Sequence, residues 1–225
     1  MSRTTFAWAA AALAATAVTT VGCLAPAAPG ASSVFPAGTA STSQAAGDAA
    51  RQLAELRVAP RGTMNGYSDA KFPHWSSHGN GCDTREAVLQ RDGRDVVTGA
   101  NCTIKSGTWY SRYDGATWTK SSDVDIDHVV PRANAWVSGA SAWTQAQREA
   151  FANDLTRPEL LTVTDNVNQA KGDRAPEAWK PPLSSAWCGY AADWIAVKHH
   201  YQLTVTRAEH DALDTMLATC DEAQR

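Results

Sequence analysis

Four of the five cysteines lie between residues 82 and 220, and they constrain the fold more than any other feature of this chain. An even set of cysteines in an exported chain is typical of a domain held by disulfide bonds. Four cysteines allow three pairings, and the entropy of loop closure favours the two shortest loops. A zinc site is the alternative, but the sequence has no Cys-x-x-Cys or Cys-x-x-His spacing. We therefore predict two local disulfides, Cys82–Cys102 and Cys188–Cys220.

The first 30 residues differ from the rest of the chain and indicate export. Arg3 precedes an apolar, alanine-rich run over residues 6–21, which small residues and prolines follow. One positive charge, an apolar stretch shorter than a membrane span and a small-residue exit are typical of a secretory signal peptide. We predict a signal peptide over residues 1–30 and a secreted, extracellular protein. The sequence around Cys23 also resembles a lipoprotein processing site, so a lipid anchor at Cys23 is the alternative.

The remaining chain has the pattern of a flexible segment followed by one α+β domain. Residues 31–50 are mainly Ala, Gly, Ser and Thr without periodicity, a composition typical of a flexible linker. We predict one domain over residues 51–225, with a small antiparallel sheet and surrounding helices. The expected helices are residues 84–91, 145–153, 166–171, 188–201 and 207–220, and the expected strands lie within 95–130 and 159–164, with a break at Ser106-Gly107.

Local signals define several of these helix boundaries. Thr144 with Gln147, and Thr206 with Glu209, have the spacing of capping boxes. Asp165 is in the place of a helix cap, and Gly172 follows the same helix.

Composition excludes a disordered chain and gives no sign of a strongly basic binding protein. Hydrophobic residues make up 44% of the chain, enough for a sizeable core. The 20 basic and 23 acidic residues give a formal net charge of −3. This balance is not that of a polybasic nucleic-acid or membrane binder. We expect no stable membrane partner and a monomer.

The densest polar cluster precedes the sequence Val129-Val130-Pro131. Acidic and apolar residues alternate from Asp123 to His128, the pattern of a half-buried strand with its aspartates on one face. A carboxylate beside a histidine suits a metal-assisted hydrolase, because the carboxylate holds a hard cation and neutral imidazole can deprotonate water. A solvated acidic edge is the structural alternative. An EF-hand calcium loop is excluded, because it requires a glycine where His128 stands.

A second segment extends this pattern. Residues 159–173 read as a strand, a turn and a helix that ends in Asn168-x-x-Lys171-Gly172-Asp173. Together with Asp-His-Val-Val-Pro at residues 127–131, this sequence resembles that of the HNH, or ββα-metal, nucleases. The match is closer to secreted bacterial nucleases related to the C-terminal domain of GmrSD-type restriction enzymes. The stretches that support this branch are residues 81–85, 135–140, 151–154, 168–173, 179–182 and 197–198.

The resemblance implies a ββα-metal core and a role for each matching residue. His128 would be the general base that activates water, while Asp127 and Asn168 would hold one divalent cation, Mg²⁺ or Mn²⁺. Asp125 is expected as a further ligand or an orienting group. In such nucleases an asparagine usually orients the histidine, and here the matching position is Glu159, whose carboxylate could accept the imidazole hydrogen bond.

Basic residues near the motifs are the expected contacts to the substrate. Lys171 and Arg174 are candidate phosphate ligands, although charges at a helix end more often serve solubility. Arg85 lies in a matching stretch and is a candidate to stabilise charge in the transition state. Nothing in the sequence supports base stacking by Trp75 or Trp109, and His74 is expected to be structural.

These interpretations predict a secreted, metal-dependent endonuclease that acts on DNA, and on RNA as a second substrate, with little sequence specificity. The competing function is a secreted cell-wall or carbohydrate-binding module on the same fold, without catalysis. The first requires Asp127, His128 and Asn168 in one site, whereas the second does not.

Overall fold

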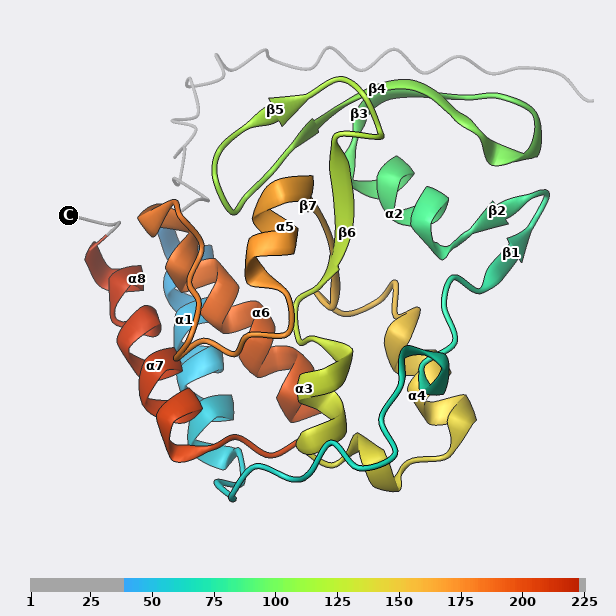
Figure 1. Ribbon diagram of the computed structural model, residues 1–225. Coiled ribbons are helices and arrows are strands. Elements are labelled where there is room, and N and C mark those ends of the chain that lie inside the picture. The colour runs from blue at the N-terminus through green and yellow to red at the C-terminus, as the bar shows by residue number, and fades with distance from the viewer. Residues whose placement is uncertain (1–38, 223–225) are drawn as a thin grey trace, which may run out of the picture. The chain divides into compact units, whose positions relative to one another are not determined.

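The computed structural model describes residues 39–222 (Figure 1). The predicted signal peptide, Cys23 and residues 31–38 lie outside the described residues. None of the helices in the described range is both long and apolar enough to cross a membrane.

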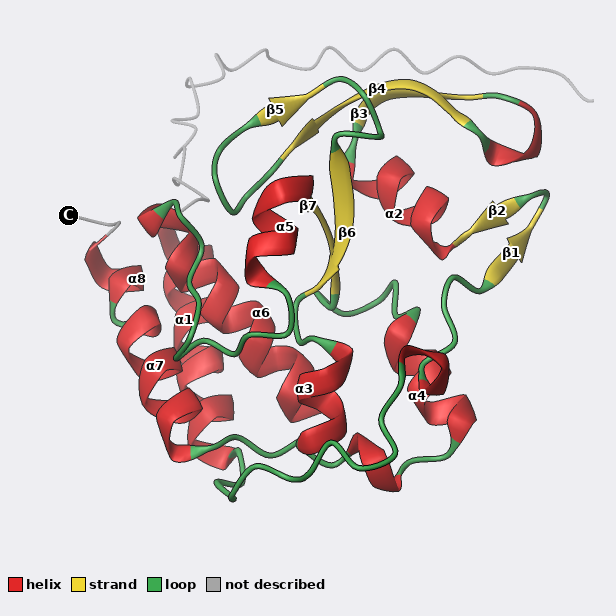
Figure 2. Cartoon of the chain, viewed as in Figure 1, coloured by secondary structure: helices red, strands yellow, loops and turns green. Residues whose placement is uncertain are grey.

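The described residues form helices and short antiparallel strands (Figure 2). The helices are α1 (Thr39–Glu55), α2 (Thr84–Asp92), α3 (Arg132–Val137), α4 (Gln145–Ala152), α5 (Asp165–Lys171), α6 (Trp187–His200), α7 (Arg207–Leu217) and α8 (Thr219–Glu222). The strands are β1 (Ser77–Gly79), β2 (Cys82–Asp83), β3 (Arg94–Thr98), β4 (Ile104–Tyr110), β5 (Thr117–Trp118), β6 (Val124–His128) and β7 (Leu160–Thr164). The predicted α+β class with small antiparallel sheets is confirmed.

Helix α1 corrects the predicted linker. Residues 39–50 were expected to be flexible, but they form most of α1. Alanine has the highest helix propensity of all residues, so an alanine-rich segment becomes a helix once it has a surface to pack against. Ala49 and Leu53 provide that contact, because both are buried in the main hydrophobic cluster. Helices α6 and α7 pack beside α1 (Figure 1).

The predicted capping boxes are confirmed at two helices. Thr144 and Gln147 cap α4 reciprocally, and Thr206 and Glu209 do the same for α7. At α5 the prediction is wrong by one residue, because Thr164 occupies the cap position and Asp165 is the first helical residue. There the acidic side chain still lies in the first turn, where the helix dipole favours it.

The first large sheet has the order β3-β4-β5, with neighbouring strands antiparallel. Strand β4 runs through Ser106 and Gly107, where a break was predicted. The ring of Trp109 explains the glycine, since a Cβ atom on Gly107 would lie 2.6 Å from that ring. Trp109 is fully buried in a second hydrophobic cluster with Val88, Leu89 and Ile126.

Both predicted disulfides are confirmed. Cys82 is bonded to Cys102 and Cys188 to Cys220, with Cα–Cα distances of 4.9 and 5.0 Å. The first links the hairpin β1–β2 to the segment before β4, and the second links α6 to α8. Each bond therefore closes a local loop at a different end of the domain.

Strands β6 and β7 pair antiparallel, and helix α5 follows β7 without a loop. The register aligns Val124 with Thr164 and His128 with Leu160. Helix α5 begins at the residue after β7 and packs against both strands (Figure 1). Two strands and a helix are thus brought together from segments about 30 residues apart, and they carry the polar motifs of the sequence.

Candidate functional site

Strand β6 presents its polar residues on one face. Val124 and Ile126 are buried against the second hydrophobic cluster, so Asp125 and Asp127 point to the opposite face, toward α5. The strand is more deeply buried than predicted, because Asp127 is only 4% exposed and His128 only 8%. Asp123 precedes the strand, and its carbonyl accepts a hydrogen bond from Asp165 at the start of α5.

A cavity of about 280 Å³ opens beside this face. It lies between β6, the end of α5, the start of α3 and the segment that contains His74 and Trp75. Asp127, His128 and Asn168 line it, so three residues with predicted roles share one cavity. The remaining lining residues are His74, Trp75, Ile126, Pro131, Arg132, Gln169, Gly172 and Asp173.

The imidazole of His128 is held in one tautomer and one orientation. Its Nε2 atom lies 3.0 Å from the carbonyl oxygen of Ala152, and a carbonyl only accepts, so Nε2 carries the proton. Nδ1 is then the nitrogen with the free electron pair. The ring stacks on Trp75 at a centroid distance of 5.7 Å and an interplanar angle of 13°.

The electrostatic surroundings of His128 keep the ring neutral. Burial, followed by the positive charge of Arg132, lowers its pKa from 6.5 to about 3. The neutral ring leaves the electron pair of Nδ1 free, which is the protonation state that the predicted general base requires.

Asp127 is a buried carboxylate with two strong donors. Lys171 Nζ donates to its Oδ1 at 2.8 Å, and the hydroxyl of Tyr113 donates to its Oδ2 at 2.7 Å. Burial raises the pKa of Asp127, while the charge of Lys171 lowers it. Each carboxylate oxygen has two lone pairs, so both oxygens retain one for a further partner.

Lys171 does not occupy the place predicted for it. Its side chain is 0% exposed, and besides Asp127 it donates to the carbonyl oxygen of His128 at 2.8 Å. The prediction that it contacts a substrate phosphate is therefore wrong. A lysine this deeply buried requires a counter-charge, and Asp127 supplies it.

Asp125 and Asn168 lie next to each other across β6 and α5. Asn168 Nδ2 is 3.3 Å from Asp125 Oδ2. Burial raises the pKa of Asp125, and the charge of Arg85 acts in the opposite direction. Asn168 lines the cavity, and Asp125 lies behind it as the carboxylate that its amide contacts, not as a lining residue.

Glu159 does not orient His128. It is fully buried, and its Oε2 accepts a hydrogen bond of 3.1 Å from the amide of Val130. Burial raises its pKa well above the usual value. The Ala152 carbonyl takes the predicted role instead, because it is the group that bonds the imidazole. Glu159 fixes the chain beyond β6 against the start of β7.

Arg85 and Arg174 lie at the margin of the site. The guanidinium of Arg85 donates to the carbonyl oxygens of Ser121 and Val124 at 2.9 and 3.3 Å, so it fixes the entry to β6. Arg174 is exposed beyond the C-terminus of α5, in a neighbouring cavity that shares Gln169, Gly172 and Asp173 with the first.

No role in the site was predicted from the sequence for three residues of the cavity, His74, Trp75 and Arg132. Trp75 stacks on His128, and Arg132 Nη1 lies 2.7 Å from His74 Nε2. His74 and Trp75 come from an irregular segment more than 50 positions before His128, so no local pattern connects them. Arg132, which directly follows Pro131, was the one detectable signal. Trp109, by contrast, is fully buried and unavailable for base stacking.

The donor atoms suit a cation that keeps most of its water. Within residues 39–222 no group of three or more His, Cys, Asp or Glu side chains could hold a metal ion. Asp125, Asp127 and Asn168 offer oxygen atoms, the amide after a flip of its side chain. Magnesium typically binds one or two carboxylates and completes its shell with water and substrate phosphate, so these residues fit it.

Comparison with known proteins identifies the family of the chain. A chain from Arthroderma benhamiae described as an uncharacterized secreted protein is 56% identical over 185 residues, which cover 82% of this chain and 91% of that protein. No solved structure matches the chain significantly. The family model for GmrSD restriction endonucleases, C-terminal domain, matches residues 84–216, more than half of the chain and all of the β6–β7–α5 unit. The chain belongs to this family of GmrSD restriction endonuclease C-terminal domains.

Proposed function

We propose that this protein is a secreted, metal-dependent endonuclease that hydrolyses phosphodiester bonds of DNA, and of RNA as a second substrate, with little sequence specificity. One observation carries the proposal. His128, Asp127 and Asn168 line a single cavity on a unit of two antiparallel strands and a helix. Membership of a restriction-endonuclease family supports the nucleic-acid substrate.

His128 is proposed as the general base. With Nε2 bonded to the Ala152 carbonyl, Nδ1 accepts the proton of a water molecule that attacks the phosphorus atom. Stacking between Trp75 and Phe151 holds the ring in place, at centroid distances of 5.7 and 6.5 Å. The residue thus meets the reaction neutral and already oriented.

Asp125, Asp127 and Asn168 are proposed to hold one Mg²⁺ or Mn²⁺ ion. When bound, such an ion would polarise the phosphoryl oxygen and stabilise charge on the leaving oxygen. Lys171 and Tyr113 fix both oxygens of Asp127, so the carboxylate would meet the ion with little loss of conformational freedom.

Arg132 is proposed to hold the scissile phosphate. It lines the cavity with His128, its side chain is only 21% exposed, and His74 supports its guanidinium. A guanidinium can donate two parallel hydrogen bonds to a phosphate, which positions as well as attracts it. Arg174, at the exposed end of α5, is a second candidate contact.

Export is part of the proposal. The apolar N-terminal segment, the two disulfides and the printed description of the fungal relative as secreted support it. Disulfides persist in oxidising compartments and are rare in the cytosol.

Plasmid digestion by the purified protein tests the proposal. We expect nicking and linearisation with Mg²⁺, loss of cleavage with EDTA, and a decrease of about 10²- to 10⁴-fold in His128→Ala. His210→Ala is the matched control, because His210 lies on α7 outside the cavity. Absence of metal-dependent cleavage would refute the proposal. Retention on insoluble polysaccharide in that case would favour the binding module.

A further inference from the structure

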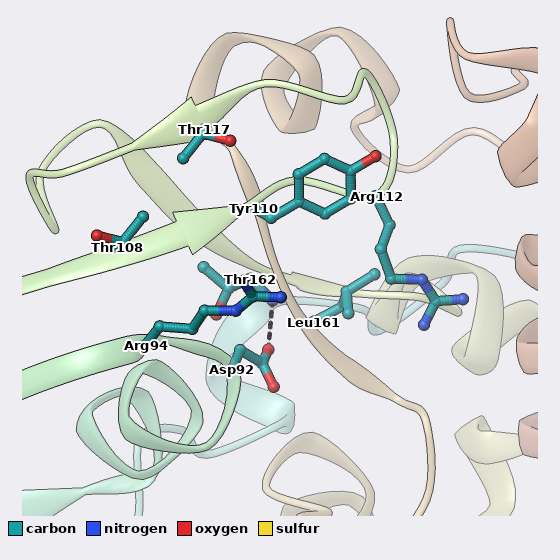
Figure 3. A pocket seen from close by; sticks show the side chains of 8 residues that line it. All are labelled: Asp92, Arg94, Thr108, Tyr110, Arg112, Thr117, Leu161 and Thr162. Atoms are coloured by element: carbon teal, nitrogen blue, oxygen red, sulfur yellow. Dashed lines mark hydrogen bonds between the residues drawn. The ribbon is translucent and has the colours of Figure 1, made fainter.

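A second cavity lies beside β7, the strand that pairs with β6. Its volume is about 430 Å³, and Leu161 and Thr162 of β7 line one side of it (Figure 3). Leu161 is the register partner of Asp127, so the two cavities are one strand apart. The main-chain amide of Thr162 donates to Asp92 Oδ2 at 2.9 Å, which closes the floor of the cavity.

The other side of this cavity is the polar face of the sheet β3-β4-β5. Thr108 and Tyr110 alternate with the buried Gly107 and Trp109 along β4, so they point away from the core. The register adds neighbours to the same face, because Arg94 pairs with Thr108 and Thr117 pairs with Tyr110. Hydroxyl groups, an arginine and an aromatic ring therefore share one surface.

Tyr110 is the most exposed large hydrophobic side chain in the described part of the chain, at 55%. Figure 3 shows its ring above the cavity, with the side chains of Arg94 and Arg112 to either side in this view. An exposed ring beside two cations has the composition of a stacking platform for nucleobases, where the ring binds a base and the cations bind phosphates.

Both arginines have N–H donors that can bind a ligand. Arg94 is exposed and forms no ion pair or side-chain hydrogen bond within residues 39–222. Arg112 uses Nη2 for Asp193 at 2.9 Å, yet its side chain remains 46% exposed and a guanidinium has five N–H donors. The carboxylate of Asp92 is occupied, because Arg91 and the Thr162 amide bind both of its oxygens.

We infer that this surface binds an unpaired nucleic-acid strand, with one base stacked on Tyr110 and the flanking phosphates on Arg94 and Arg112. The strand must be unpaired because a base within a duplex has no free face for the ring. The inference rests on the proposed function and deepens it: the surface would direct single-stranded substrate, or an unpaired end, toward the strand pair β6–β7, which carries His128.

Fluorescence anisotropy with a labelled oligothymidylate of about 12 nucleotides tests the inference, in EDTA so that the strand stays intact. We expect Tyr110→Leu to weaken binding roughly 5- to 150-fold, while Tyr110→Phe stays within about twofold, because only the first loses the stacking ring. Arg94→Ala and Arg112→Gln should each reduce the slope of log K against log salt by about 0.7. Glutamine at 112 retains a donor for Asp193.

Arg207→Ala is the control, because Arg207 is an exposed arginine on α7. It should leave binding and slope unchanged. Unchanged binding in Tyr110→Leu and an unchanged slope in both arginine variants would overturn the inference. So would an equal loss of affinity for a blunt duplex, or Tyr110-dependent retention on polysaccharide without oligonucleotide binding. Metal-dependent plasmid cleavage is scored separately, so the surface and the catalytic site can fail independently.

Discussion

Replacement of Lys171 by methionine tests the internal support of the candidate site. Methionine has nearly the length of lysine, so the change removes the charge and the two hydrogen bonds to Asp127 and His128 while it keeps most of the volume. Asp127, whose side chain is 6% exposed, then remains as a buried carboxylate with the Tyr113 hydroxyl as its donor.

Loss of one partner from a buried ion pair costs about 3–5 kcal/mol, because the other charge stays desolvated. Small domains have total stabilities of about 5–15 kcal/mol, so Lys171→Met should remove a large fraction. With a urea m-value of about 2–3 kcal/mol/M, the unfolding midpoint should fall by roughly 1–2.5 M. Lys120→Met, at an exposed position, is the matched control and should shift the midpoint little.

The double variant Lys171→Met/Asp127→Asn identifies the cause. An asparagine carries no charge and still accepts the Tyr113 hydrogen bond, so the double variant should be more stable than Lys171→Met alone. The reasoning is refuted if Lys171→Met unfolds within about 1 kcal/mol of the wild type. A lowered salt slope of DNA binding with unchanged stability would instead support the phosphate contact that the sequence suggested.

Four further outcomes are expected. Because the pKa of His128 is lowered from 6.5 to about 3, the wild type should lose stability as pH falls through 6.5. Between about pH 8 and about pH 5 it should lose about 2 kcal/mol more than His128→Gln, as measured by urea unfolding. Asn168→Ala should lose most plasmid cleavage and regain part of it in excess Mg²⁺, whereas His128→Ala should not respond. Replacing Cys188 and Cys220 by serine should lower the unfolding free energy by about 3–4 kcal/mol, from a sequence separation of 32 residues. Arg85→Ala should lower it by about 1–3 kcal/mol, because two backbone carbonyls lose a charged donor.

Local chemistry explains which parts of the fold the sequence could predict. Strand β6 could be predicted because acidic and apolar residues that alternate with a period of two match a β-strand and not a helix. The capping boxes could be predicted because the two partners of each box lie three residues apart. Helix α1 was not, since an alanine-rich segment is compatible with both a linker and a helix until α6 and α7 supply a surface. Packing against these two helices, which are distant in sequence, decides that the segment is a helix.

The same distinction applies to the site. Asp127, His128 and Asn168 could be expected in one site because the resemblance to HNH nucleases joins their two motifs, and all three line one cavity. The roles of Lys171 and Glu159 were not, because they depend on which atoms face the interior across 43 and 29 residues of chain. Charge alone suggested a phosphate contact for Lys171, whereas burial makes it the counter-ion of Asp127.

This pairing explains how a chain with a net charge of −3 can present acidic residues to a polyanion. Lys171 offsets the charge of Asp127, and the charge of Arg85 lowers the pKa of Asp125. Arg132 adds a positive charge beside His128, where the phosphate would lie. Salt screens charges only weakly when they lie a few ångströms apart, because the Debye length at physiological ionic strength is about 8 Å. Attraction at the site therefore requires no basic surface elsewhere, and overall acidity does not argue against a nucleic-acid substrate.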